Sequence, residues 1–248
     1  MLINGHKLNV ESHGPDNGPA VVLLHHGLGS IRAWKANVPA LAAAGLHVIA
    51  YDRWGYGKSD ARAELGQPYF EADQADLLSL LDELQLGQAA LVGHSDGGTI
   101  AMYFAAAHPE RIAKLVTVAA HIYVEPKMQA GPEMIRATYE NDPDFQRRFT
   151  RQHGEKAGQV FQNWYGGWFR TDNLSWDMRP VLSNITCPTL VIQGEQDEHA
   201  SPQHAINIAE AIPGAGLWLL PGAGHMLPQE EAKRFNPCLI EFLGGAVK

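Results

Sequence analysis

The segment from Gly93 to Gly98 places a serine where a strand must turn abruptly into a helix. Ser95 follows the apolar run 89–92 and precedes a stretch of small and apolar residues. The flanking glycines carry no Cβ atom, so the serine can adopt a strained backbone that exposes its hydroxyl above the sheet. In such a turn the next backbone N–H, that of Asp96, faces the oxyanion that serine attack creates. Ser95 is therefore a candidate nucleophile and Asp96 a candidate oxyanion donor.

Two later loops supply the partners that a serine nucleophile needs. A serine hydroxyl reacts poorly until a histidine takes its proton and a carboxylate holds that histidine. Asp197 lies in an acidic loop after one apolar run, and His225 lies in a glycine-rich loop after the next. Glu195 and Glu198 flank Asp197 and are the competing carboxylates. The sequence predicts a triad of Ser95, Asp197 and His225.

These residues and two further segments resemble the alpha/beta-hydrolase family over nearly the whole chain. The order Ser, Asp, His with each residue just past a strand is the arrangement of that family. The segment 25–29 resembles its H-G loop, which implies that the N–H of Leu28 is the second oxyanion donor. The segment 52–59 resembles the D-x-R-G-x-G-x-S motif, but Trp54 shifts the spacing by one residue at Arg53. The resemblance implies a serine hydrolase.

Within this family the chain is most similar to the biphenyl-hydrolase-like, or valacyclovir-hydrolase-like, serine esterases. The similarity is carried by the serine-Asp-Gly-Gly elbow, by the segment 120–124 and by Cys187-Pro188. It implies cleavage of a small carboxylic ester, or a related acyl bond, through an acyl-enzyme and without a cofactor. Carbon–carbon bond hydrolases, perhydrolases and hydroxynitrile lyases use the same triad and stay open as alternatives. So does a small-ligand receptor on a hydrolase scaffold. Dehalogenases and epoxide hydrolases use an aspartate nucleophile and are disfavoured by Ser95.

The hydrophobic pattern predicts an α/β fold with a mostly parallel central sheet and helices on both faces. Leucines at helical spacing predict a helix over 70–86 that ends at Gly87, and a second helix over 98–108 stops at Pro109. Four acidic residues of the first helix are expected to face solvent: Glu71, Asp73, Asp76 and Asp82. An N-terminal hairpin is predicted over 2–12, and strands over 21–26, 47–52, 89–94, 113–119, 189–193 and 216–220.

One segment, 125–180, interrupts the alternation with short helical patterns rich in aromatic residues. We interpret it as a helical cap inserted before the late strands of a single domain, whose core is formed by 1–124 and 181–248. Trp164, Trp168 and Phe169 are candidate walls of an apolar substrate pocket. The alternative is that these aromatic residues only fasten the cap to the main layer.

The side chain of Asp96 needs a partner because its negative charge lies beside a developing oxyanion. One solution is structural, through hydrogen bonds to loop N–H groups or an ion pair with a residue such as Arg53. The other is functional, because a cationic amino group on the substrate would neutralise the carboxylate. On the second interpretation Asp96 is a substrate-binding residue.

Composition excludes several classes of protein. The chain has 248 residues, a net charge of −8 and scattered basic residues, so nucleic acid and anionic membranes are not expected partners. The N-terminus lacks a signal-peptide pattern and no apolar run is long enough for a membrane span, which predicts a soluble, cytoplasmic protein. Two cysteines are too few for a disulfide framework, and no metal-binding motif is present. The expected partner is a small acyl substrate, and the oligomeric state is open.

Overall fold

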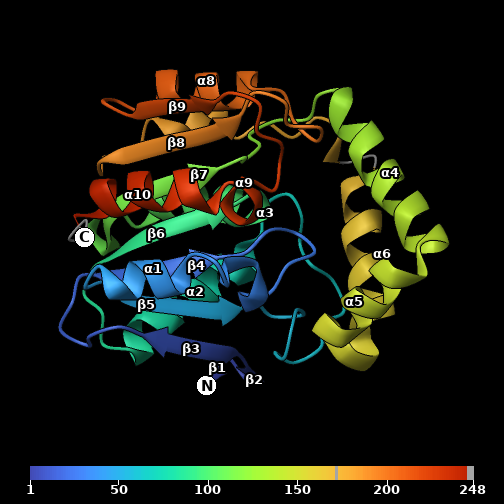
Figure 1. Cartoon of the computed structure of the whole chain (residues 1–248), viewed down its shortest axis with the longest axis horizontal. Helices are drawn as coiled ribbons and strands as arrows, with labels where there is room; N and C mark the ends of the chain where they lie inside the picture. The colour runs from blue at the N-terminus through green and yellow to red at the C-terminus, as the bar shows by residue number, and fades with distance from the viewer. Residues whose placement is uncertain (171–172, 245–248) are drawn as a thin grey trace.

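A computed structural model describes residues 1–170 and 173–244, which form a seven-stranded sheet between two layers of helices (Figure 1). The strand order is β3-β5-β4-β6-β7-β8-β9, and all neighbouring pairs are parallel except β3 with β5. This arrangement confirms the predicted mostly parallel α/β sheet. The strands are β3 Asn9–His13, β4 Ala20–Leu24, β5 His47–Asp52, β6 Ala89–His94, β7 Ile112–Val118, β8 Thr189–Gly194 and β9 Gly216–Leu220.

The N-terminal hairpin is shorter than predicted. Strands β1 (Leu2–Ile3) and β2 (His6–Lys7) pair through the two-residue turn Asn4-Gly5, in which both φ angles are positive. Such a turn closes a hairpin tightly. The chain then leaves the hairpin, and β3 pairs with β5 at the edge of the main sheet instead.

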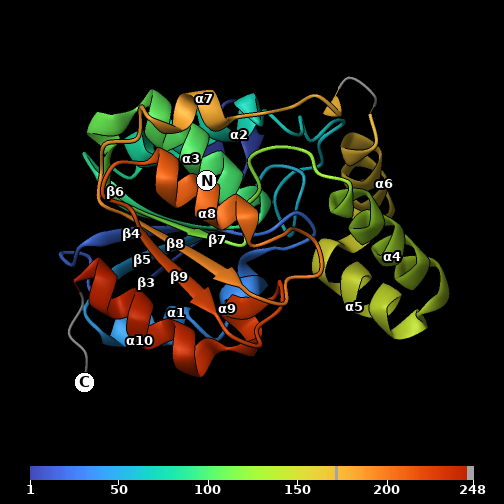
Figure 2. The same cartoon turned by 90° about the horizontal axis from the view of Figure 1, so that it is seen from above.

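Both faces of the sheet are buried, which explains why its strands are continuously apolar rather than alternating. Leu91 and Val92 are neighbours on β6, yet both are fully buried because they pack into different core clusters. Figure 2 shows the two helical layers. One face carries α2 Glu71–Glu83, α3 Asp96–Ala107, α7 Arg179–Leu182 and α8 Gln203–Ala211, and the other carries α1 Val38–Ala43, α9 Leu227–Glu230 and α10 Ala232–Leu243. Short 3₁₀ turns are η1 Ile31–Trp34 and η2 Pro109–Arg111.

The expectation that all four acidic residues of α2 face solvent is wrong for two of them. Asp73 and Asp76 are only 2% and 3% exposed. Asp73 accepts hydrogen bonds from Arg53 at 2.9 Å and from Arg62 at 2.6 Å. Asp76 lies 2.8 Å from the Nε2 atom of His6. Basic groups from β2 and from the loop after β5 thus cover this part of the helix, and helical periodicity alone does not reveal them.

The ends of the two predicted helices also shift. Helix α2 ends at Glu83, and Gln85 rather than Gly87 takes the left-handed backbone conformation after it, with φ 55°. Helix α3 begins at Asp96, directly after the elbow, and ends at Ala107 before Pro109. The nucleophile candidate therefore lies immediately at a helix N-terminus.

Between β7 and β8 the chain forms helices that stand beyond the carboxyl ends of the strands (Figure 1). They are α4 Lys127–Asn141, α5 Pro143–His153, η3 Gly154–Lys156 and α6 Ala157–Trp168. Their aromatic residues pack on one another, and the rings of Tyr139 and Phe161 stack 3.9 Å apart. Trp176 joins the main core instead, so the aromatic residues of 125–180 serve different purposes. None of the helices within the described residues has the length and apolar character needed to cross a membrane.

Candidate active site

The elbow holds Ser95 in a backbone conformation that few non-glycine residues adopt. Its φ and ψ angles are 55° and −121°, and its N–H donates to the carbonyl of Val118 on β7 at 2.8 Å. The neighbouring glycines are sterically required. A Cβ atom on Gly93 would lie 2.2 Å from the carbonyl oxygen of Gly97, and one on Gly97 would lie 2.3 Å from that of Leu24. The strain is therefore fixed by close packing of the elbow against β4 and α3.

Asp197 and His225 come together from the loops after β8 and β9. The His225 Nδ1 atom lies 2.8 Å from the Asp197 Oδ2 atom. Three further groups donate to this carboxylate: the N–H groups of His199 and Ala200 at 2.8 and 3.1 Å, and the side-chain amide of Gln193 at 2.7 Å. The carboxylate is thus fixed from several sides, and it keeps the proton of His225 on Nδ1, which leaves Nε2 as the acceptor.

The electrostatics of this pair favour an ionised Asp197 and a basic His225. Burial raises the pKa of Asp197, but His225 and the donated hydrogen bonds outweigh it and hold that pKa well below its ordinary value. Burial lowers the pKa of His225, but the Asp197 carboxylate outweighs it and raises that pKa above 6.5. By contrast, burial lowers the pKa of His199 to about 4, although this residue lines the same pocket.

The two competing glutamates occupy different positions from Asp197. Glu198 accepts a hydrogen bond from the backbone N–H of His225 at 3.1 Å, so it supports the loop rather than the imidazole. Glu195 is exposed, and its backbone N–H continues the pairing with β9 through the carbonyl of Leu220. Only Asp197 of these three carboxylates reaches the ring of His225 among the described contacts.

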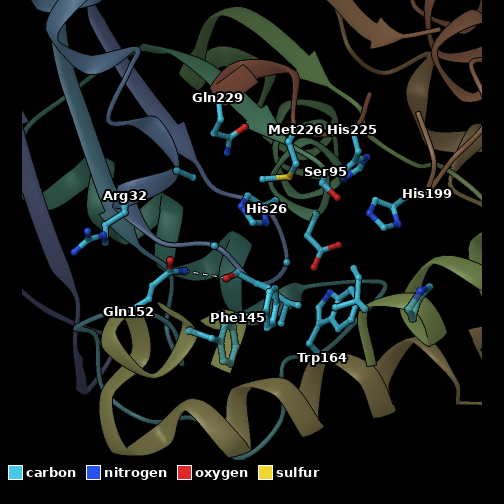
Figure 3. Close-up of a pocket in the computed structure, with 18 of the residues that line it drawn as sticks. His26, Arg32, Ser95, Phe145, Gln152, Trp164, His199, His225, Met226 and Gln229 are labelled. Atoms are coloured by element: carbon cyan, nitrogen blue, oxygen red, sulfur yellow. Dashed lines mark hydrogen bonds between the residues drawn. The ribbon is translucent and has the colours of Figure 1, made fainter. Parts of the chain in front are cut away.

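Two backbone N–H groups are available at the predicted oxyanion positions. Asp96 is the first residue of α3, where the N–H has no partner within the helix. In the part of the chain that the structure describes, no group accepts from the N–H of Leu28. The carbonyl of Leu28 accepts from the Gln152 Nε2 atom at 2.9 Å, drawn as a dashed line in Figure 3, and lies 3.2 Å from His153 Nε2. Helix α5 therefore holds the loop that carries this N–H.

A pocket with a volume of about 710 Å³ lies between the sheet and the inserted helices (Figure 3). Ser95, Asp96, Leu28 and His225 line its inner side. The remaining wall includes apolar side chains of the inserted helices, namely Met128, Ile135, Phe145, Phe149, Trp164 and Trp168. The structure thus places Ser95, His225 and two of the three predicted wall residues, Trp164 and Trp168, around one cavity.

Phe169 does not line this pocket, contrary to the sequence-based expectation. Trp164 and Trp168 are four residues apart on α6 and share the face that meets the cavity. Phe169 follows one residue later and packs against Tyr165, with ring centres 4.7 Å apart. The helical period explains the difference, because consecutive residues point in directions about 100° apart.

The carboxylate of Asp96 is buried at the base of the pocket. Its Oδ2 atom has no hydrogen-bond partner in the described structure and lies 4.0 Å from the Arg53 Nη2 atom. Its Oδ1 atom lies 3.5 Å from the Nε2 atom of His121. Arg53 also forms an ion pair with Asp73 at 2.9 Å.

The other histidines near the pocket have structural contacts. His94 Nε2 lies 2.9 Å from the carbonyl oxygen of His225, and burial lowers the pKa of His94 to about 3. His25 accepts from the N–H of Arg53 at 3.1 Å, and its Nδ1 atom lies 2.8 Å from the carbonyl of His26. Within residues 1–170 and 173–244, no group of three or more histidine, cysteine, aspartate or glutamate side chains is arranged to hold a metal ion.

Many residues that line the pocket were not predicted from the sequence, Gln152, His199 and His26 among them. Gln152 and His199 line it from α5 and from the loop after β8, and His26 lies beside the elbow. Of these three, only Gln152 carried a signal, because Phe145, Phe149 and Gln152 recur at the spacing of one helical face. The other two positions depend on how distant loops meet.

Comparison with known proteins agrees with the geometry. The profile of the alpha/beta hydrolase fold family matches residues 19–166. A putative carbamate hydrolase RutD from Variovorax paradoxus is 31% identical, over 95% of this chain and 96% of that protein. The serine hydrolase BPHL of Mus musculus is 28% identical over 98% of this chain and 85% of that protein. The crystal structure of an enol-lactonase from Burkholderia xenovorans superposes with a TM-score of 0.80, at 25% identity over 98% and 99% of the two chains. The chain belongs to the alpha/beta hydrolase fold family.

Proposed function

We propose that the protein is a serine hydrolase that cleaves a small carboxylic ester or a related acyl bond. One observation carries the proposal: a strained Ser95 at a helix N-terminus shares a pocket with His225, whose Nδ1 atom is held 2.8 Å from the buried Asp197. This is the combination of nucleophile, base and orienting carboxylate that acyl transfer requires. The similar proteins include a carbamate hydrolase, a serine hydrolase and an enol-lactonase by name, which supports acyl-bond cleavage.

In the proposed reaction the Nε2 atom of His225 accepts the proton of Ser95 as the serine oxygen attacks the acyl carbon. Asp197 stabilises the resulting imidazolium. The N–H groups of Leu28 and Asp96 bind the tetrahedral oxyanion, and each such donor contributes about 3 kcal/mol in comparable sites. The leaving group departs with the proton from His225. Water then hydrolyses the acyl-enzyme by the same proton transfers and restores Ser95.

The inserted helices have a role in this proposal. We assign residues 125–180 to a cap on a core formed by 1–124 and 181–248, with Trp164 and Trp168 as walls that contact the substrate. Apolar walls around the reaction centre limit the access of bulk water and strengthen the electrostatic interactions inside.

Asp96 has a second proposed role through its side chain. Asp96 lines the pocket, and its Oδ1 atom, 3.5 Å from His121 Nε2, receives no hydrogen bond in the described structure, so a substrate amino group would find an acceptor there. Arg53 already supplies part of the compensating charge from 4.0 Å. The test measures kcat/KM for an α-amino acid ester and its des-amino analogue on wild type and on Asp96→Asn. The comparison distinguishes a substrate-binding role of the Asp96 carboxylate from a structural one. Equal kcat/KM for both esters on wild type assigns the carboxylate a structural role.

The experiment that tests the function uses Ser95→Ala and a fluorophosphonate probe. We expect the probe to label the wild type on Ser95, and kcat for an activated ester to fall by about 10³-fold or more in the variant. Circular dichroism of both proteins checks that the fold is retained. Near wild-type turnover by Ser95→Ala would remove this residue from the mechanism.

A panel of esters, thioesters and aminoacyl esters, with a carbon–carbon bond substrate beside them, then distinguishes esterase activity from the alternatives. Labelling without any turnover would favour a receptor.

A further inference from the structure

Four basic side chains line the pocket in addition to the groups of the proposed reaction. Arg32 and Lys35 come from η1 and the residue after it, on the side of the sheet. Arg148 and Arg151 come from α5, on the side of the inserted helices. All four are exposed to solvent, whereas the acidic residue that lines the same pocket, Asp96, is buried at its base. Two separate parts of the fold therefore bring positive charge to one opening.

This positive charge is largely uncompensated. Within the described residues, Arg32, Lys35 and Arg151 form no ion pair, and Arg148 has only a 3.9 Å contact with Asp142. Two other arginines of the inserted helices are paired, Arg136 with Glu133 and Glu140, and Arg147 with Asp144. The chain as a whole carries 27 acidic and 19 basic residues, so an unpaired basic group at the pocket is not a consequence of composition. Like charges repel, and an anion bound among them would relieve that repulsion.

Two arginines of α5, Arg148 and Arg151, line the pocket, whereas Arg147 of the same helix does not. Phe145, Arg148, Phe149 and Gln152 recur at three- and four-residue intervals and all line the cavity. Arg147 lies one turn before Arg151 but does not line the cavity; its side chain is 70% exposed and pairs with Asp144. Arg147 can therefore serve as a control for substitutions of Arg148 and Arg151 on the same helix.

Arg32, one of the four basic residues, lies away from the reaction centre. In Figure 3, Arg32 is drawn on the far side of the pocket from Ser95, His225 and His199, and Gln152 lies near it. A substrate whose acyl carbon reaches Ser95 would therefore extend along the apolar walls and present its other end to the basic residues. A carboxylate is the group that guanidinium and ammonium side chains bind through charge-assisted hydrogen bonds.

We propose that Arg32, Lys35, Arg148 and Arg151 form a subsite for a carboxylate at the distal end of the substrate. The substrate class is then a half-ester of a dicarboxylic acid, or an ester whose leaving group carries a carboxylate. The proposal rests on the proposed function, because it uses Ser95 as the point of attack. Each solvent-exposed contact contributes little, roughly a factor of two to five in binding, so the subsite acts through the sum of its members.

The test compares matched substrates that differ only in charge. The first pair is 4-nitrophenyl hydrogen adipate and 4-nitrophenyl adipamate, in which a carboxamide replaces the carboxylate of the acyl chain. The second pair is 4-carboxyphenyl and 4-carbamoylphenyl acetate, which carry the charge on the leaving group. We expect kcat/KM for the carboxylate member of at least one pair to exceed that of its neutral partner by about tenfold at low salt. We also expect this ratio to fall toward one in 0.5 M NaCl, because exposed charges are screened over about 8 Å already at 0.15 M.

Variants connect the ratio to the named residues. Arg148→Gln combined with Arg151→Gln, and Arg32→Gln combined with Lys35→Gln, should each reduce the carboxylate-to-amide ratio about threefold or more, whereas Arg147→Gln should not change it. A wild-type ratio near one in both pairs, or a ratio that both double variants retain, overturns the subsite. In that case, hydrolysis of the ester bond in the neutral, carboxamide-bearing substrates, together with labelling of Ser95, shows that the proposed function still holds. Absence of turnover for all four esters together with an unlabelled Ser95 means that the proposed function itself has failed.

Discussion

At the scale of single residues, the proposed chemistry depends on the orientation of one imidazole ring. The Nδ1 atom of His225 faces Asp197, and the backbone of His225 is held by His94 at its carbonyl and by Glu198 at its N–H. Asp197 is in turn fixed by a side-chain amide and by the backbone of its own loop. Because these contacts set both the tautomer and the basicity of His225, they also set two measurable properties.

The first property is the rate. Asp197→Asn should lower kcat by about 10⁴-fold, because an amide in place of the carboxylate stabilises the wrong tautomer of His225. Glu195→Gln should leave kcat nearly unchanged, and Glu198→Gln should have an intermediate effect, because Glu198 contacts the backbone of His225 and not its ring. Steady-state kinetics on an activated ester measure all three. A severe loss in Glu198→Gln combined with a mild loss in Asp197→Asn would assign the third member of the triad to Glu198.

The second property is the pH dependence. His225 must be neutral to accept the serine proton, so kcat/KM should rise with pH and be lost as His225 becomes protonated at lower pH. Because Asp197 raises the pKa of His225, the midpoint should lie above the ordinary value of 6.5. In Asp197→Asn the midpoint should move to lower pH. A wild-type profile centred well below pH 6 would contradict the proposed coupling between these two residues.

At the scale of elements, helix α5 connects the inserted helices to the loop that carries Leu28, the proposed oxyanion donor. The Gln152 side chain donates to the carbonyl of Leu28 at 2.9 Å, and His153 lies 3.2 Å from the same oxygen. The Nδ1 atom of His153 also accepts from the N–H of Gly57 at 2.9 Å. Burial lowers the pKa of His153 to about 4, so its ring is neutral at physiological pH and its Nε2 atom carries the proton toward Leu28. The inserted helices therefore contact the loop of Leu28, the proposed oxyanion donor, as well as lining the pocket.

This connection predicts a positioning role for Gln152. Gln152→Leu keeps the size of the side chain but removes the hydrogen-bond donor to Leu28. The N–H of Leu28 should then be held less firmly, and kcat should fall by about tenfold. This loss is smaller than the 10²- to 10³-fold decrease in kcat that follows the complete loss of an oxyanion donor. The control is Gln146→Leu on the same helix, whose amide donates to the carbonyl of Tyr139 and which does not line the pocket. Both variants are first shown to be folded. The prediction is contradicted if kcat is unchanged in Gln152→Leu, or if kcat falls equally in Gln152→Leu and Gln146→Leu.

At the scale of the whole molecule, one buried charge network joins the end of β5, the following loop and α2. Arg53 and Arg62 both donate to Asp73, at 2.9 and 2.6 Å, and Arg53 reaches Asp96 in the pocket from 4.0 Å. All of these side chains are at least nine-tenths buried. Removal of one member of a buried pair leaves an uncompensated charge, which costs far more than the loss of an exposed pair.

Asp73→Asn should therefore lower the free energy of unfolding by about 3 kcal/mol. The matched control is Asp82→Asn on the same helix, because Asp82 pairs with Arg111 at 2.8 Å but is 62% exposed, and its loss should cost less than about 1 kcal/mol. Urea denaturation followed by circular dichroism measures both. Equal midpoints for the two variants would show that the network around Asp73 does not stabilise the fold.

The sequence by itself determined the features that depend on local sterics and on periodicity. Glycines at fixed places around Ser95 specify the elbow, apolar runs specify buried strands, and the succession of strand and helix specifies a parallel sheet. Asp197 and His225 were predicted to be partners from their positions after successive strands, because parallel strands bring their carboxyl ends to one edge, and the structure places their side chains 2.8 Å apart. Each of these signals lies within a few residues of the feature it predicts.

Only the tertiary structure decided which side chains from distant segments meet. Asp73 is buried because Arg53 and Arg62 fold over it, and the turn of α6 places Trp168 in the pocket and Phe169 outside it. The contact of Gln152 with Leu28 joins residues 124 positions apart. Such pairings depend on the packing of the inserted helices against the sheet, which no local propensity encodes. The same packing brings two separate pairs of basic residues to the opening of one pocket.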